Sequence, residues 1–250
     1  MGEKHLVPHA PEWRRSERGI LDEIPSVVGL ALWQLLRHVR DWVDCSTTER
    51  EHLFHDTTQP WVNTKYRHAE IEAPAVASAI RVLRGLQAAP VAIGADAVAD
   101  ACSHIAEWAS SLGWSETAVQ YAEAAAAAVS ASAHRANEAG RIARNHGEYA
   151  RAETWFERGI ALGRQQRDSI AYTRGHIGYG ILCQTIGRDK RAQRHFNTAS
   201  IAARKRGRFW LAAEAQHDLL LMMAERGEYA QAATHAKKAL RWYPKHHPRF

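Results

Sequence analysis

The stretch HGEYARAETWFERGI (residues 146–160) and the stretch RGEYAQAATHAKKAL (residues 226–240) carry the same Gly-Glu-Tyr-Ala tetrapeptide, at positions 147 and 227. Two further glycines, Gly113 and Gly187, complete a series with intervals of 34, 40 and 40 residues. A period of this length is typical of solenoid proteins, in which one supersecondary unit is repeated and stacked. The spacing therefore predicts a repeat architecture.

Small residues recur in a fixed register around these glycines. They stand seven residues before the glycine in three units of four, and five and twelve residues after it in all four. The positions are Ala106, Gly140, Gly180 and the exception Leu220, then Ala118, Ala152, Ala192 and Ala232, then Ala125, Gly159, Ala199 and Ala239. Glycine accepts the left-handed conformation that ends many helices, and small residues let two antiparallel helices approach closely. The pattern predicts helical hairpins, which must stack because one hairpin cannot bury its own apolar face.

In the second and third units a bulky residue, Phe156 or Phe196, stands nine residues after the glycine. Together with LGWSETAVQYAEAA and IGRDKRAQRHFNTAS, these segments resemble the tetratricopeptide repeat (TPR) family, over about 150 residues from Asp96 to Pro244. The resemblance implies an all-α fold: a right-handed α-solenoid of about four helical hairpins over residues 95–245, followed by a tail at 246–250. The 40-residue periods exceed the basic 34 and are similar to the long-helix variants of bacterial regulators and adaptor proteins.

Residues 1–90 are predicted to form a separate helical module that covers the N-terminal end of the solenoid. Ser46 and Glu49 form a capping-box pattern for a helix over residues 47–56, and Pro74 opens another helix. A longer helix, which follows Pro25, has one apolar stripe, and four tryptophans are expected in the core. The stripe consists of Val28, Leu32, Leu35, Leu36, Val39 and Trp42, and the tryptophans are Trp13, Trp33, Trp42 and Trp61.

The composition is that of a folded protein, with 46% apolar and 24% charged residues. The three cysteines have no framework spacing, which indicates reduced thiols in the cytosol. The most apolar early run covers residues 27–36, whereas a membrane span needs about 20 apolar residues. We therefore expect a cytoplasmic protein.

Charge is distributed unevenly along the chain. Residues 1–130 contain 11 Lys and Arg against 17 Asp and Glu, whereas residues 131–250 contain 22 against 10. The net charges are thus −6 and +12, which give the +6 of the whole chain. This asymmetry indicates an acidic partner for the second half, docking between the halves, or arginines scattered over solvated helix faces.

Patterns for catalysis and cofactor binding are absent from the sequence, so we expect neither an enzyme nor a cofactor. There is no P-loop and no nucleophile elbow, and GHIGYG (residues 175–180) has its glycines in the wrong order for a dinucleotide site. His52, His55 and Asp56 could contribute to a metal site, but no third ligand pattern accompanies them, so no metal site is predicted.

The TPR resemblance implies that the first helix of each hairpin lines a concave groove, with exposed positions at i, i+4 and i+7. Amides can hold a peptide backbone, arginines can bind carboxylates, and aliphatic residues can supply pockets. The candidate ligand-binding residues are Asn137, Arg141, Arg144, Asn145, Arg174, Ile177, Ile181, Gln184, His217 and Leu221. They predict a protein- or peptide-binding scaffold or adaptor, whose partner carries an acidic or extended segment.

Two alternatives remain open: a regulatory protein that senses a signal peptide, and a nucleic-acid-associated protein that uses the basic C-terminal half. The N-terminal module contains no helix-turn-helix pattern, which argues against nucleic acid as the main partner. Because no polar capping helix follows the fourth hairpin, we expect either self-association or a partner at that end, or further repeats in a longer protein. We expect an open apolar edge there through Leu219, Met223 and Leu240.

Overall fold

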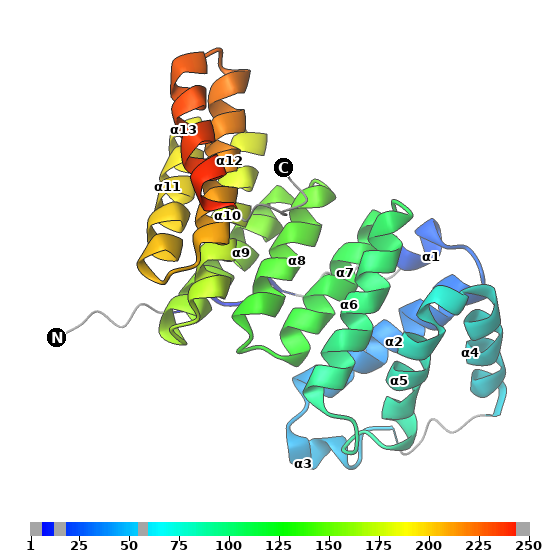
Figure 1. The fold of residues 1–250 in the computed structure, drawn as a ribbon. Coiled ribbons are helices and arrows are strands. Elements are labelled where there is room, and N and C mark those ends of the chain that lie inside the picture. Colours follow the sequence, from blue (N-terminus) through cyan, green and yellow to red (C-terminus); the bar gives the residue numbers. More distant parts are fainter. Residues whose placement is uncertain (1–6, 13–18, 55–59, 244–250) are drawn as a thin grey trace. The chain divides into compact units, whose positions relative to one another are not determined.

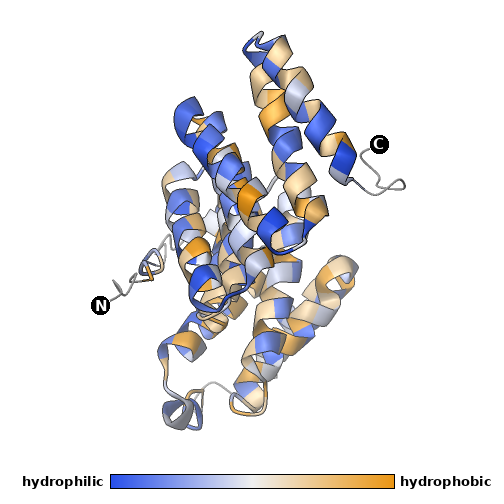
Figure 2. Cartoon of the chain, turned by 60° about the vertical axis from the view of Figure 1, so that its left-hand side comes forward, coloured by the Kyte–Doolittle hydropathy of each residue, from blue (hydrophilic) through white to orange (hydrophobic). Residues whose placement is uncertain are grey.

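The computed structural model describes residues 7–12, 19–54 and 60–243, and within this part of the chain it is all-helical (Figure 1). The helices are packed consecutively in pairs, as expected for an all-α helical repeat. Hydrophobic and hydrophilic residues alternate along them (Figure 2), which is the pattern of helices that bury one face. The expected tail at 246–250, as well as Trp13, His55 and Asp56, lies outside the described residues, and the side chain of Trp61 is not described.

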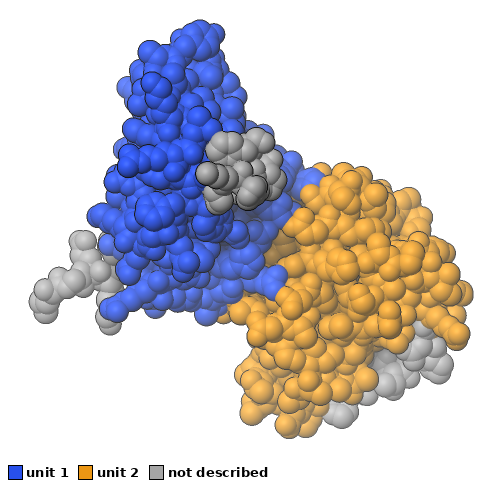
Figure 3. Space-filling model, in the orientation of Figure 1, with its two compact units in different colours: residues 1–11, 131–250 blue, residues 12–130 orange. Residues whose placement is uncertain are grey.

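The chain forms two compact units (Figure 3): unit 2 comprises residues 12–130, and unit 1 comprises residues 1–11 and 131–250. The expected boundary was near residue 90. The compact units place the first expected hairpin, around Gly113, with the N-terminal helices rather than with the other three hairpins.

Unit 2 consists of seven α-helices in its described part. They are α1 (Gly19–Glu23), α2 (Val27–Asp44), α3 (Thr47–Arg50), α4 (Pro60–Glu72), α5 (Ala77–Ala88), α6 (Ala95–Ser111) and α7 (Ser115–Ala128), with a 3-10 turn at Pro74–Val76 before α5. The predicted apolar stripe of α2 is confirmed, since all six of its residues are buried. The capping box of Ser46 and Glu49 is confirmed too, but α3 ends at Arg50 instead of residue 56. None of its residues is buried, and a helix without tertiary packing is short.

The grouping of α6 and α7 with the N-terminal helices has a clear physical basis. The carboxylate of Glu23 accepts hydrogen bonds from the backbone N–H groups of Glu116 and Thr117, at 2.6 and 2.9 Å, in the first turn of α7. The hydroxyl of Tyr121, which is fully buried, donates to the carbonyl of Leu32 at 2.7 Å. Helix α7 therefore shares its core with α1 and α2, and the sequence register around Gly113 could not reveal this.

Unit 1 contains three hairpins, each built from two consecutive helices. The helices are α8 (Ala133–Asn145), α9 (Tyr149–Gln165), α10 (Ser169–Thr185), α11 (Asp189–Lys205), α12 (Phe209–Glu225) and α13 (Tyr229–Trp242). Residues near the N-terminus also belong to this unit: the Arg158 guanidinium donates to the Pro8 carbonyl at 2.6 Å.

The predicted turn glycines are confirmed. Gly113, Gly147, Gly187 and Gly227 have φ values of 77°, 79°, 72° and 75°, which an L-residue rarely adopts. After Gly187, for example, the backbone N–H of Arg188 donates a hydrogen bond to the carbonyl of Cys183 at 2.7 Å, which completes a Schellman motif.

The turns between hairpins use the same motif, which the sequence register missed. Gly207 has φ 67° and Arg167 has φ 58°. Turns therefore fall at positions 147, 167, 187, 207 and 227, so each 40-residue period contains two similar helix–turn halves.

The expected open edge of the last hairpin needs correction. Leu219 and Met223 are 0% and 1% exposed, because they belong to a core cluster with residues of α10 such as Leu182. Leu240 is 56% exposed, and Tyr229 of the same helix is 73% exposed. Self-association through this end stays a prediction.

Candidate functional site

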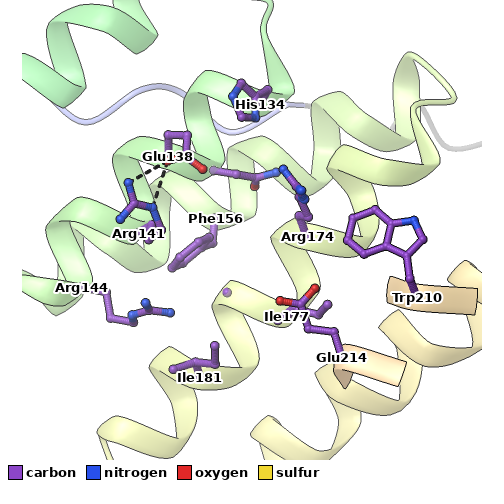
Figure 4. A pocket seen from close by; sticks show the side chains of 12 residues that line it. His134, Glu138, Arg141, Arg144, Phe156, Arg174, Ile177, Ile181, Trp210 and Glu214 are labelled. Carbon is purple, nitrogen blue, oxygen red and sulfur yellow. Dashed lines mark hydrogen bonds and ion pairs between the residues drawn. The ribbon is translucent and has the colours of Figure 1, made fainter. Parts of the chain in front are cut away.

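A cavity of about 420 Å³ lies in unit 1, between the first helices of its three hairpins (Figure 4). Helices α8, α10 and α12 supply most of its walls, and one aromatic side chain of α9 adds to them. The lining residues are His134, Asn137, Glu138, Arg141, Arg144, Phe156, Arg174, Ile177, Gly178, Ile181, Trp210 and Glu214. We call the faces of α8, α10 and α12 that line this cavity the inner face.

The lining follows the 40-residue register. His134, Arg174 and Glu214 occupy equivalent positions of three successive hairpins, 40 residues apart, and all three line the cavity. The repeat thus brings residues that are distant in sequence to one surface. Because the residue types differ at equivalent positions, the cavity is chemically asymmetric.

Arg141 and Arg144 lie at one end of the cavity, while Trp210 lies at the other (Figure 4). Arg141 forms an ion pair with Glu138 at 2.8 Å. Arg144 donates to the side-chain oxygen of Asn145 at 2.9 Å. Burial lowers the pKa of Arg144, and the positive charge of Arg141 lowers it further, whereas Asp218 acts in the opposite direction. A partly buried guanidinium beside a like charge favours an anionic ligand.

The middle of the cavity is apolar. Phe156 and Ile177 are 1% and 6% exposed, and Ile181 lies next to them on α10. The guanidinium of Arg174 stands 5.6 Å from the ring centroid of Trp210, which is within cation–π range. Arg174 is exposed. The cavity therefore combines a cationic end with an apolar floor.

Asn137 was expected to be an exposed ligand-binding residue, but it is only 6% exposed. Its amide nitrogen donates to the carbonyl of Ala171 at 2.8 Å, which ties α8 to the start of α10. Its amide oxygen lies against Gly159 and Gly175, where a Cβ on either glycine would collide with it. Asn137 is buried because α8 packs closely against α9 and α10 at this point. It still forms part of the cavity wall.

Six of the ten candidate residues line the cavity: Asn137, Arg141, Arg144, Arg174, Ile177 and Ile181. The other four, Asn145, Gln184, His217 and Leu221, do not line it. Gln184, for instance, donates to the carboxylate of Glu225 at 2.7 Å. Sequence reasoning missed His134, Glu138, Phe156, Gly178, Trp210 and Glu214 as lining residues. The 40-residue register could have found Glu214, because it is the equivalent of Arg174.

Among the described residues, no group of three or more His, Cys, Asp or Glu side chains is arranged to hold a metal ion. In the same part of the chain, no helix is both long enough and apolar enough to cross a membrane. Cys45, Cys102 and Cys183 are free thiols, and the last two are buried. Comparison of the sequence with protein-family models and with curated proteins found no match.

Proposed function

We propose that this protein is a non-enzymatic scaffold or adaptor of the TPR type, a right-handed solenoid that binds an acidic, extended segment of a partner protein on its inner face. One observation carries the proposal: a single cavity is lined by equivalent positions of three successive hairpins and has two arginines at one end. The repeat spacing supports the TPR assignment, and the free thiols are compatible with the cytoplasm.

The cationic end of the cavity accounts for the acidic ligand. Burial lowers the pKa of Arg144 and repulsion from Arg141 lowers it further, so a carboxylate placed between Arg141 and Arg144 would offset both effects. Guanidinium groups bind carboxylates with paired, charge-assisted hydrogen bonds, each worth about 1.5–3 kcal/mol when the groups are partly desolvated.

The apolar floor accounts for the peptide. A volume of about 420 Å³ is in the usual range of ligand cavities and is lined on one side by Phe156, Ile177 and Ile181. An apolar side chain of the peptide would occupy this space, a few residues from the acidic one. Flanking residues of the peptide would then extend along α10, which continues beyond the cavity at both ends, and along α12 beyond Glu214.

A regulatory protein that senses a signal peptide is the second candidate, because the same cavity would serve a short free peptide. The two candidates differ in the length of the ligand. A partner segment retains its affinity when it is embedded in a folded protein, whereas a signal peptide requires free termini.

The test is to select binders from a random peptide library and to measure their affinities by calorimetry for the wild type and two variants. We expect the wild type to select peptides with Asp or Glu near an apolar residue. Arg141→Glu with Arg144→Glu should then weaken binding by well over tenfold, since two charge-assisted contacts are lost.

The matched control is Arg164→Glu with Arg167→Glu, which makes the same change in net charge at exposed positions of unit 1 outside the cavity. Arg158 is unsuitable as a control, because it donates to the Pro8 carbonyl. The control should retain wild-type affinity. Equal losses in both variants would mean diffuse electrostatic attraction, and retained affinity in the cavity variant would exclude the cavity as the binding site.

A further inference from the structure

A second charged surface lies on helix α11, none of whose residues lines the cavity of the inner face. Its exposed positions form one stripe, because they recur at intervals of three, four or seven residues. We call this the outer stripe; it consists of Lys190, Arg194, Asn197, Ile201, Arg204 and Lys205. It contains no acidic residue, and none of its four basic side chains forms an ion pair with any residue that the structure describes.

Helix α13 continues this surface. Arg204 of α11 stands 5.3 Å from the ring of Trp242 at the end of α13, and Arg226, just before α13, lies 3.9 Å from Asp189 at the start of α11. Arg204 thus contacts the end of α13 directly, whereas Arg226 of the turn between α12 and α13 pairs with the start of α11. Helix α13 contains no Asp or Glu, and its basic residues are exposed; they are Lys237, Lys238 and Arg241.

The repeat fold does not require most of these charges. The equivalent positions of the preceding hairpin, 40 residues earlier, lie on α9. Lys190 corresponds to Ala150, Arg194 to Thr154 and Lys205 to Gln165, whereas Arg204 corresponds to another exposed arginine, Arg164. The same contrast continues into the following turn, where Arg206 and Arg208 correspond to Gln166 and Asp168.

Helix electrostatics explain only two of the four basic residues: Arg204 and Lys205 are in the last turn of α11, where the helix dipole favours a cation. Lys190 is in the first turn, where the partial positive charge of the dipole disfavours a cation. A hollow of about 450 Å³ opens beside it, lined by Gly187, Arg188, Asp189, Lys190, Arg191, Arg194 and Arg226. Arg188 and Arg191 are paired with Glu153, at 3.3 and 2.8 Å, but Lys190 and Arg194 have no such partner among the described residues.

We propose that the outer stripe of α11, together with the basic residues of α13, binds the phosphate backbone of a nucleic acid. Lys190 and Lys205 are 15 residues apart, so the stripe is roughly 22 Å long, and duplex DNA of that length carries on the order of 13 phosphates. The surface presents four lysines and three arginines, and the planar guanidinium groups of Arg194, Arg204 and Arg241 suit phosphate oxygens. With Asn197 as the one amide of the stripe, the contacts are to the backbone and give no base specificity.

An anionic membrane fits this surface less well. A helix that lies on a bilayer inserts an apolar face between the lipids. The apolar face of α11 instead lies in the protein core, where Ala192, Phe196 and Ala199 are 0% exposed. On the outer stripe, Ile201 is the one large apolar side chain.

The experiment measures fluorescence anisotropy of a labelled DNA duplex of about 20 base pairs and of the corresponding single strand, between about 50 and 200 mM salt. We expect binding of at least one probe that weakens steeply with salt. Lys190→Gln with Arg194→Gln should weaken it by roughly tenfold and make the slope of log K against log salt shallower by about 1.8, since two phosphate contacts are lost.

Arg164→Gln with Arg167→Gln is the matched control, because it removes two charges from exposed positions of α9 and its turn. It should retain both the affinity and the slope of the wild type. Peptide binding by the Lys190→Gln, Arg194→Gln variant should also be unchanged, which separates this surface from the inner face. Equal weakening in both variants, failure to bind either nucleic acid, or binding only to vesicles rich in phosphatidylserine would overturn the proposal.

Discussion

Phe196 of α11 fits against Gly180 of α10, so closely that a Cβ on Gly180 would lie 2.5 Å from the ring. The preceding hairpin repeats the arrangement 40 residues earlier, with Phe156 against Gly140 at 3.0 Å. Both rings are buried, at 0% and 1% exposure. The small residue before the turn and the bulky residue after it thus form one packing unit in both hairpins.

Gly180→Ala should destabilise the protein. In an exposed helix this change stabilises by about 1 kcal/mol, but here the added methyl group collides with a buried ring, and overpacking costs about 1–3 kcal/mol. Urea unfolding measures the difference. Phe196→Leu should reduce the cost of Gly180→Ala in a double-mutant cycle. A stabilising effect of Gly180→Ala would show that the contact is not close.

Arg167→Gly should stabilise the protein by about 0.5 kcal/mol. Arg167 has φ 58°, a conformation that costs a side-chain-bearing residue about 1 kcal/mol, and glycine removes this cost while losing some entropy on folding. Gly187→Arg, at φ 72°, should have the opposite effect. Thermal unfolding of both variants provides the measurement, and the same sign of change for both would contradict the assignment of the turns.

Acidification should destabilise unit 1 through two partly buried histidines, His176 and His195. The Nδ1 atoms of His176 and His195 are 2.9 Å apart. Burial, with His195 next to it, lowers the pKa of His176 to about 3, and burial, with Arg191 and Arg194 nearby, lowers that of His195 to about 4. Unfolded histidine titrates near 6.5, so the unfolded chain binds protons first. The free energy of unfolding should be fully retained above pH 6.5 and fall as the pH drops from 6.5 towards 4.

Urea unfolding at pH 7.5, about one unit above the pKa of unfolded histidine, and at pH 5, inside the window in which stability falls, tests this expectation. His195→Gln should reduce the difference in unfolding free energy between the two pH values. The control is His134→Gln, at an exposed position of α8, which should leave the difference unchanged. An identical pH dependence in His195→Gln and the wild type would contradict the account.

The glycine register predicted the hairpins and their turns because both depend on local chemistry: a left-handed cap and a small residue at a helix crossing. Arg167 shows where this reasoning stops, since an arginine in the same conformation leaves no signal in the sequence. Asn137 shows a second limit. Its spacing matched an inner-face position, but its burial depends on how closely α8 packs against Gly159 and Gly175. The grouping of α7 with α1 and α2 depends on the Glu23 contacts, which span more than 90 residues of sequence.

The most direct test of the peptide-binding inner face is an exchange of charge between Arg144 and the ligand. An acidic peptide that binds the wild type is resynthesised with Lys in place of its acidic residue, and the affinities of both peptides are measured for the wild type and Arg144→Glu. The account predicts that each change alone weakens binding by about tenfold or more and that the two changes together restore much of the affinity. Additive losses, with no recovery in the exchanged pair, would contradict it.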